Sequence, residues 1–493
     1  MTLDDVEDIE TLRRAAKLLE AENQKFVREI AKLKRQLHEL KGGDPEQLTL
    51  QLAGLEQQLA TLRNKVFGDS SEKRLRDKTA DGGSTKPQTG HGPREQAALS
   101  IIEQVHVADE ADKICKACGA ALGEWSGQFE ESEEIDVIER RFVLKKHKRQ
   151  KYRCSCGECI ETAPGPAKLF DGARYSPSFA ISVAVEKYLD HLPLERQVRV
   201  MQREGLEVQS QTLWDQINAL ASVLAPVHDK LQEYVLSHSV VGADETHWRL
   251  MGAKGKPEGD AKRWQVWAVV CADAVSYRIL DSRSAKAAAE VLGDYSGTVL
   301  CDGYSAYDSL RKKSGRFKLA HCWAHVRRKF VEVEEQHPAV CKQILDLIGE
   351  LYAVEREAKT GPPNLKLQLR NERSRPIVAR IHEWALQAQA LPQSPLGKAI
   401  AYMGGMWEGL QLFLHDAEID IDNNATERAL RGVVVGRKNH YGSRSQRGTE
   451  VAALFYSLLE SAKLAGVGPH TYLQIATYAA LHGAPIPLPH ELR

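Results

Sequence analysis

The sequence predicts a multidomain α+β protein with helical segments at both ends and a mixed sheet near its centre. Its 493 residues would accommodate about three domains. Heptad spacing in the first 40 residues predicts a long helix, whereas short apolar runs between residues 240 and 302 predict strands. Hydrophobic residues make up 42% and charged residues 27%, as in folded soluble domains. This composition argues against a largely disordered or collagen-like chain.

Global charge identifies no partner. The chain has 67 Lys and Arg and 67 Asp and Glu, so a nucleic-acid-binding surface would require local clusters of basic residues. No apolar run approaches the roughly 18 residues of a membrane helix, so we expect no membrane partner. The N-terminus is acidic where a secretory signal would be basic and then apolar. We therefore expect a cytoplasmic protein whose cysteines are thiols or metal ligands.

Residues 1–68 are predicted to form a coiled-coil, or leucine-zipper, dimerisation segment. Residues 1–40 lack Gly and Pro, and their core positions form two heptad columns: Ile9, Ala16, Asn23, Ile30 and Leu37, and Leu12, Leu19, Phe26, Leu33 and Leu40. A core asparagine such as Asn23 fixes register in parallel two-stranded coils, which predicts a homodimer. Helices packed on a globular core are the alternative. Residues 69–98, rich in Ser, Lys, Gly, Asp and Pro, predict a flexible linker.

Residues 99–168 form the predicted zinc-binding module. They contain two pairs of cysteines whose members are separated by two residues, a spacing that lets four thiolates bind one structural Zn²⁺. The pairs are Cys115 with Cys118 and Cys156 with Cys159. Cys154 could replace either member of the second pair. Reduced, merely buried cysteines are the alternative.

A basic run follows an acidic one inside this module. Residues 140–153 carry eight Lys or Arg and no acid, whereas residues 130–139 carry six acids. Such a run can bind DNA phosphates, and the residues that we expect to do so are Lys145, Lys146, Lys148 and Arg149. A solvated strand that pairs with the acidic residues is nearly as well supported.

Residues 169–235 are predicted to form a helical, helix-turn-helix-like DNA-binding segment. The stretch 194–203 is amphipathic, Gly205 breaks it, and Ser210 can cap a following helix. Two helices joined by a short turn that contains Gly fit a helix-turn-helix motif. Bundles that bind no DNA contain such turns as well, so both interpretations stay open.

The middle of the chain, residues 236–450, predicts a mixed sheet. The expected elements are strands over 240–244, 263–273 and 275–280, a helix over 284–292 and a strand over 298–302. This β-β-β-α-β order is that of the ribonuclease H-like fold, in which the first and fourth strands lie side by side. Because Asp244 and Asp302 end these two strands, we expect their carboxylates to be neighbours.

Neighbouring aspartates indicate a metal site, because two close carboxylates repel each other unless a hard divalent cation lies between them. A third carboxylate would complete a two-metal site, and Glu427 in Asp422-Asn-Asn-Ala-Thr-Glu427-Arg-Ala-Leu-Arg431 is the best candidate. Mg²⁺ and Mn²⁺ both suit carboxylate oxygens. Asn424 and Glu427 also fit a helix capping box, and aspartates often end strands, so a structural role is the alternative.

Four segments of the chain resemble the signature segments of the Insertion Sequence 66 transposases. They are Ala-Asp244-Glu-Thr, Cys-Asp302-Gly-Tyr-Ser-Ala-Tyr307, His-Cys322-Trp-Ala-His325-Val-Arg-Arg-Lys-Phe330 and the segment that contains Glu427. Residues 66–73, the cysteine pairs and residues 436–443 and 452–460 also fit, so the resemblance covers nearly the whole chain. It implies a DDE transposase, a polynucleotidyl transferase in which Asp244, Asp302 and Glu427 bind two Mg²⁺ or Mn²⁺ ions.

In the implied mechanism, one ion activates water or a 3′-hydroxyl and the other stabilises the leaving oxygen. The same site could then cleave the element end and transfer it into target DNA, with no protein nucleophile. The resemblance further implies a bacterial protein that is associated with the nucleoid when bound to DNA. Small accessory proteins of the same element are candidate partners.

Residues 331–420 predict a mostly helical insertion into the catalytic domain, and residues 451–493 a C-terminal helical segment. Basic side chains follow Glu427, and we expect phosphate contacts, over a solvated basic face, from Arg431, Arg437, Lys438 and Arg444. Cys322 and His325 have the spacing of metal ligands. Without a second pair nearby, we expect a buried structural role for them.

The sequence as a whole favours a transposase that acts on paired element ends as a homodimer or larger assembly. A dimeric, zinc-containing DNA-binding repressor with an inactive catalytic fold is the first alternative. A structure-selective nuclease on the same fold, which would share the metal ions and lack strand transfer, is the second.

Overall fold

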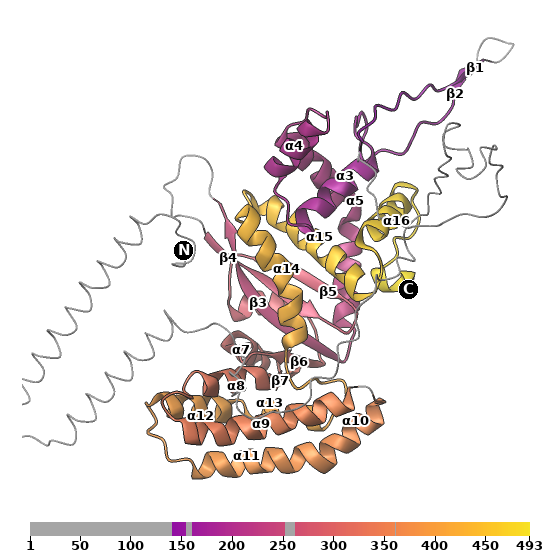
Figure 1. The fold of residues 1–493 in the computed structure, drawn as a ribbon. Helices are drawn as coiled ribbons and strands as arrows, with labels where there is room; N and C mark the ends of the chain where they lie inside the picture. The colour runs from indigo at the N-terminus through magenta and orange to yellow at the C-terminus, as the bar shows by residue number, and fades with distance from the viewer. Residues whose placement is uncertain (1–140, 154–159, 252–261, 360) are drawn as a thin grey trace, which may run out of the picture. The chain divides into compact units, whose positions relative to one another are not determined.

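The computed structural model describes residues 141–153, 160–251, 262–359 and 361–493. The predicted coiled coil, the linker and the five cysteines of the zinc module lie outside these residues. The described chain is built around a five-stranded mixed sheet in the order β5-β4-β3-β6-β7 (Figure 1). Its strands are β3 (Val240–Leu250), β4 (Lys262–Val270), β5 (Val275–Leu280), β6 (Thr298–Cys301) and β7 (Lys318–His321).

The register of this sheet confirms that the first and fourth strands, β3 and β6, are neighbours. β3, β4 and β5 are antiparallel in succession, whereas β6 is parallel to β3 and β7 is parallel to β6. β3 pairs with β6 only as far as Gly242↔Leu300. The expectation that Asp244 ends its strand is wrong, because β3 continues to Leu250 alongside β4. Within the described chain, β3 therefore has no strand partner on its β6 side from Ala243 to Trp248.

The other edge of the sheet is closed by helix α15 (Gln446–Leu464). Ser461 Oγ accepts a hydrogen bond from Val275 N at 2.9 Å, and Ser457 Oγ accepts one from Tyr277 N at 2.8 Å. Serine hydroxyls thus satisfy backbone groups of β5 that would otherwise form an open strand edge. The domain boundary predicted at residue 450 falls inside α15, most of whose residues are buried.

Residues 169–235 are mostly helical, as predicted. The helices are α3 (Pro177–Tyr188), α4 (Leu194–Arg203) and α5 (Ser210–Leu236). Ser210 is the first residue of α5 and Gln209 is its N-cap, so the predicted cap is wrong. α5 packs against α3, α15 and α16 (Pro469–Leu481), and one of its faces, which includes Leu213 and Ile217, is buried. The DNA-binding role of this segment stays a prediction.

Residues 331–420 are mostly helical, as predicted. The elements are α9 (Pro338–Ala358), α10 (Pro363–Leu369), the π-helix η3 (Arg370–Ser374), α11 (Arg375–Gln387), α12 (Pro395–Gly405) and α13 (Trp407–Leu410). With α8 (Trp323–Val331) they enclose an apolar cluster beside β6 and β7 (Figure 1). Arg370 is fully buried there, and its Nε and Nη1 donate to Glu355 Oε1 and Phe413 O, both at 2.7 Å.

Among the described helices, none is by itself long and apolar enough to cross a membrane. α15 and α16 pass such a test only as a pair that is bent by 119°.

Candidate active site

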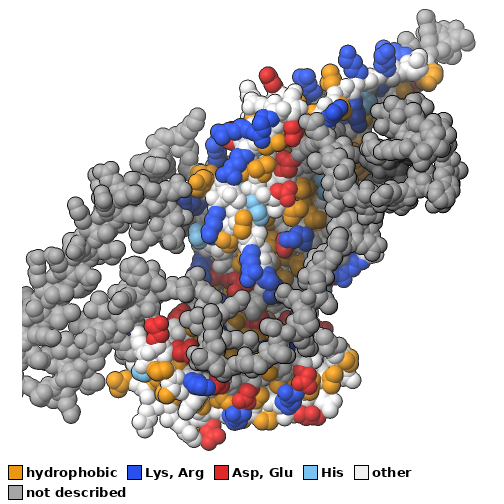
Figure 2. Space-filling model, viewed as in Figure 1, with side chains coloured by type: hydrophobic (Ala, Val, Ile, Leu, Met, Phe, Trp, Pro, Cys, Tyr) orange, Lys and Arg blue, Asp and Glu red, His pale blue; other side chains and the backbone are white. Residues whose placement is uncertain are grey.

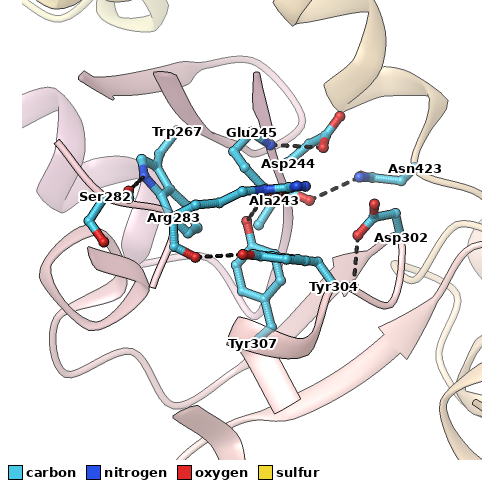
Figure 3. Close-up of polar contacts among 10 residues, drawn as sticks. All are labelled: Ala243, Asp244, Glu245, Trp267, Ser282, Arg283, Asp302, Tyr304, Tyr307 and Asn423. Carbon is cyan, nitrogen blue, oxygen red and sulfur yellow. Dashed lines mark hydrogen bonds and ion pairs between the residues drawn. The ribbon is translucent and has the colours of Figure 1, made fainter. Parts of the chain in front are cut away.

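Asp244 and Asp302 lie at the point where β6 ends. Because Gly242 pairs with Leu300 in parallel register, the two aspartates occupy corresponding positions two residues further along. Asp244 Oδ1 accepts a hydrogen bond from Glu245 N at 2.8 Å, and Asp302 Oδ1 accepts one from Tyr304 N at 2.9 Å. Figure 3 shows both carboxylates on the side of the strand where Asn423 lies. The tertiary structure thus brings the two predicted acids together.

Helix α14 (Asn424–His440) carries Glu427 in its first turn. The preceding residue, Asn423, is buried, and its Nδ2 donates a hydrogen bond to Ala243 O at 3.0 Å while its Oδ1 accepts one from Thr426 Oγ1 at 2.6 Å. Asn424 is not an N-cap, because it is the first helical residue and its amide bonds Asp422. The capping-box alternative is therefore wrong. The polar start of α14 is instead docked on the open edge of β3.

Gly242 makes this docking sterically feasible. A Cβ at this position would lie 2.1 Å from Thr426 Oγ1 and 2.9 Å from Asn423 Oδ1, distances that no side chain tolerates. The absence of a side chain at Gly242 lets the start of α14 approach β3. Glu427 is thereby brought to the strand that carries Asp244.

The acids influence one another electrostatically. Burial is the largest cause that raises the pKa of Asp244, from 3.8 to about 7, and the charges of Glu245, Asp302 and Glu427 act in the same direction. The side-chain oxygen Oε1 of Glu427 is buried and has no hydrogen-bond partner in the described chain. A buried carboxylate oxygen without a donor, near the half-buried carboxylate of Asp244, suits a hard cation that prefers oxygen ligands. The donor set therefore fits Mg²⁺ or Mn²⁺.

The ligand atoms of the three acids are not all within 4.8 Å of one another. Among the described residues, the group of three that meets this limit is His238, Cys271 and Asp273. Asp273 already accepts hydrogen bonds from the Tyr234 hydroxyl, and this group lies before the start of β3 and in the β4–β5 turn. The wider spacing of the acids does not suit a single-ion cage. It is compatible with two ions about 3.5–4 Å apart.

Sequence reasoning missed Glu245, which directly follows Asp244. Its side chain is fully buried and accepts hydrogen bonds from Arg283 Nε at 2.8 Å and from the Tyr307 hydroxyl at 3.1 Å (Figure 3). Burial raises the pKa of Glu245, although Arg283 lowers it. The available signal was the pair of adjacent acids in one strand. Because neighbours in a strand face opposite sides of the sheet, Asp244 and Glu245 face different sides, so Glu245 has its own surroundings.

Cys322 and His325 belong to the surroundings of Glu427. Cys322 is buried, and its Sγ accepts a hydrogen bond from Asn423 N at 3.2 Å, which agrees with the structural role expected for it. His325 Nε2 lies 3.6 Å from Glu427 Oε1. The histidine is therefore a neighbour of the candidate site, which the spacing of the two residues by itself does not reveal.

The predicted DNA-binding residues differ in their exposure. Lys145, Lys146, Lys148, Arg149, Arg431, Lys438 and Arg444 are all exposed. Arg437 is half-buried and bonds Thr246 Oγ1 at 3.1 Å, so it braces α14 against β3. Figure 2 shows Lys and Arg side chains on the face that α4 and α14 present. In the basic run, β1 (Lys151–Arg153) pairs with β2 (Ile160–Thr162).

Comparison with known families gives two matches. Residues 172–451, more than half of the chain, match the model described as Transposase IS66 family. Residues 112–157 match the model described as zinc-finger binding domain of transposase IS66. The second match contains Cys115, Cys118, Cys154 and Cys156 and ends before Cys159.

Individual relatives were also found. The chain is 29% identical over 490 residues to Uncharacterized protein y4jD of Sinorhizobium fredii, covering 95% of this chain and 92% of the relative. It is 32% identical over 411 residues to Uncharacterized protein y4qI of the same organism, and the match covers 79% of this chain and 74% of the relative. A solved structure, the Mos1 transposase paired-end complex with left transposon end, matches 32% of this chain and 60% of its own at 10% identity. Its TM-score of 0.11 is too low to support a conclusion.

Proposed function

Because this chain belongs to the IS66 transposase family, we propose that it is a DNA transposase that binds the ends of an insertion sequence, cleaves a strand there and transfers it into target DNA. The observation that supports this chemistry is the meeting of Asp244 and Asp302, from neighbouring parallel strands, with Glu427 at the start of α14. The strand order β5-β4-β3-β6-β7 supports a ribonuclease H-like catalytic domain within residues 236–450.

In this proposal Asp244, Asp302 and Glu427 bind two Mg²⁺ or Mn²⁺ ions through carboxylate oxygens. Such ions, when bound, activate a water or a 3′-hydroxyl and stabilise the leaving oxygen of the phosphodiester. The chain's own residues hold the acids in place: Asn423 docks the helix of Glu427 on β3, and Tyr304 N orients Asp302. His325 is placed to orient Glu427. No protein nucleophile is required.

DNA recognition is assigned to other parts of the chain, because phosphates carry no sequence information. We assign sequence recognition to the zinc module and to residues 169–235. Phosphate contacts are assigned to the exposed basic residues Lys145, Lys146, Lys148, Arg149, Arg431, Lys438 and Arg444. Zn²⁺ would be bound by Cys115, Cys118 and a pair from the second cluster. Residues 1–68 would form a homodimer, and small accessory proteins of the same element are further candidate partners.

The proposal is tested by a cleavage and strand-transfer assay on DNA that carries the flanking element ends, with Mg²⁺ or with chelator. We expect metal-dependent nicking and joining by the wild type. Asp244→Ala and Asp302→Asn should reduce both by about 1,000-fold, since several kcal/mol of transition-state stabilisation are lost, while end binding is retained. The matched control is Asp294→Asn, whose carboxylate is exposed and pairs only with Arg316 in the described chain.

Two results would contradict this proposal. Persistent cleavage by Asp302→Asn would overturn the assignment of the acids. End-specific binding without cleavage under either metal ion would favour the DNA-binding repressor.

A further inference from the structure

Arg283 lies beside the candidate site and is held by a buried carboxylate. Its Nε donates to Glu245 Oε1 at 2.8 Å and its Nη2 donates to the same oxygen. The Glu245 side chain is 0% exposed, whereas that of Arg283 is 48% exposed. The carboxylate is therefore fully enclosed, while the guanidinium that neutralises it reaches the surface.

Tyr304 links Arg283 to the turn that carries Asp302. The Tyr304 ring lies 3.9 Å from the centre of the guanidinium, and its hydroxyl donates to Arg283 O at 2.6 Å. The backbone N–H of the same tyrosine bonds Asp302 Oδ1. Burial lowers the pKa of Arg283. The hydrogen bond to Glu245 and the charges of Glu245 and Asp302 outweigh this effect and raise the pKa above its ordinary value. Figure 3 shows Arg283, Glu245, Tyr304 and Asp302 close together, near the point where β3 and β6 cease to pair.

The arrangement leaves part of the guanidinium unused. Arginine has five N–H donors in a planar fork, and Arg283 uses one on Nε and one on Nη2 for Glu245. Its Nη1 makes no hydrogen bond to any described residue. Because the Glu245 carboxylate and the Tyr304 ring already restrict the Arg283 side chain, little conformational entropy remains to be lost when an anion binds. A planar, fixed guanidinium of this kind suits a phosphate.

We propose that Arg283 binds a backbone phosphate of the DNA strand at the catalytic site, and that Glu245 and Tyr304 are its positioning residues. This inference rests on the proposed function. An ion pair that served only to neutralise a buried glutamate would not require a half-exposed guanidinium next to a catalytic carboxylate.

The test measures how binding of the full chain to flanking element-end DNA depends on salt in the presence of Mg²⁺. All proteins carry Asp244→Asn to prevent cleavage; in the described chain the Asp244 side chain bonds the backbone N–H of Glu245 and neither side chain of the Glu245–Arg283 pair, so that pair stays intact. Each phosphate contact contributes about 0.9 to the slope of log affinity against log salt. Arg283→Gln should lower the slope by about 0.9 and weaken binding by about tenfold at physiological salt.

The matched control is Arg316→Gln. Arg316 is 51% exposed and pairs with Asp294, but it precedes β7 at the opposite end of the parallel strands from Asp302. The Arg316→Gln variant should show the same slope of log affinity against log salt as the parent protein. The double variant Glu245→Gln/Arg283→Gln leaves no buried charge unpaired, and it should show the same lowered slope as Arg283→Gln with a melting temperature near the parent's.

The outcomes separate the inference from the proposed function. An unchanged slope in both Arg283 variants, with the parent protein binding tightly, would overturn the phosphate contact and leave the transposase proposal standing. A parent protein that does not bind element-end DNA under any salt condition would overturn both. Recovery of slope and affinity in the double variant would also count against the contact, because loss of fold in the single variant would then explain the defect.

Discussion

The side-chain amide of Asn423 donates a hydrogen bond to the carbonyl oxygen of Ala243 at 3.0 Å. The bond joins the start of α14 to the edge of β3 at the first position that β6 no longer pairs. A backbone carbonyl that would otherwise be buried without a partner is thereby satisfied. The same contact brings the helix of Glu427 to the strand of Asp244. Because β3 extends beyond the end of β6, its edge is open there, and the helix that carries the third acid packs against this edge.

Substitution of Gly242 by Ala should disrupt this docking. The added Cβ would lie 2.1 Å from Thr426 Oγ1, so the start of α14 must shift and the free energy of unfolding should fall by about 1–3 kcal/mol. Gly349→Ala is the matched control, because a Cβ there meets nothing within 4 Å in α9, and it should stabilise by about 0.5–1 kcal/mol. Urea denaturation measures both. Equal stabilities of the two variants would contradict the steric argument.

The raised pKa of Asp244 predicts a pH dependence of stability. Because the folded state holds this proton more tightly than the unfolded chain, the stabilisation is complete below the ordinary pKa of 3.8 and is lost as pH rises to about 7. In chelator, the wild type should therefore lose stability relative to Asp244→Asn between pH 4 and 7, with a constant difference above that range. Thermal melts across pH measure it, with Asp294→Asn as control. A wild type that gains stability relative to Asp244→Asn over this range would contradict the raised pKa.

Ser461 closes the β5 edge and should matter more than an ordinary helical serine. Its Oγ accepts from Val275 N at 2.9 Å and donates to Val275 O at 3.0 Å, and all three groups are buried. Ser461→Ala should cost about 1–3 kcal/mol, because a buried N–H loses its partner. Ser182→Ala, which removes only a bond to Ser178 O within α3, should change stability by less than about 0.5 kcal/mol. Similar losses in the two variants, measured by urea denaturation, would show that the edge is not closed by the hydroxyl.

The cysteine pairs should bind one structural Zn²⁺ per chain. Metal analysis of the purified full chain is expected to show loss of that ion in Cys118→Ser, whereas Cys341→Ala, at a buried cysteine of α9, should retain it. Zinc that persists in Cys118→Ser would contradict the assignment. A comparison of zinc content in Cys154→Ser and Cys159→Ser identifies the fourth ligand. The two residues differ in that the family match contains Cys154 and ends before Cys159.

Local pattern was sufficient to predict several parts of the described chain. The apolar runs predicted β3, β4, β5 and β6, and the adjacency of the first and fourth strands follows from their order. The amphipathic spacing of residues 194–203 predicted α4 with the bounds that the structure shows. These features depend on side-chain periodicity and on the rules of strand connection, which a sequence displays directly.

The sequence therefore identified the three candidate acids, whereas their surroundings were decided only by the tertiary structure. Glu245 bonds Arg283 at a separation of 38 residues, Ser461 bonds Val275 across 186, and Asn423 bonds Ala243 across 180. The sequence does not reveal these partners, because Glu245, Ser461 and Asn423 each resemble ordinary surface polar residues and two of the groups that they bond are backbone atoms. The physical reason is that burial creates the demand for a partner: a charge or N–H removed from water must be matched by whatever group the fold places next to it.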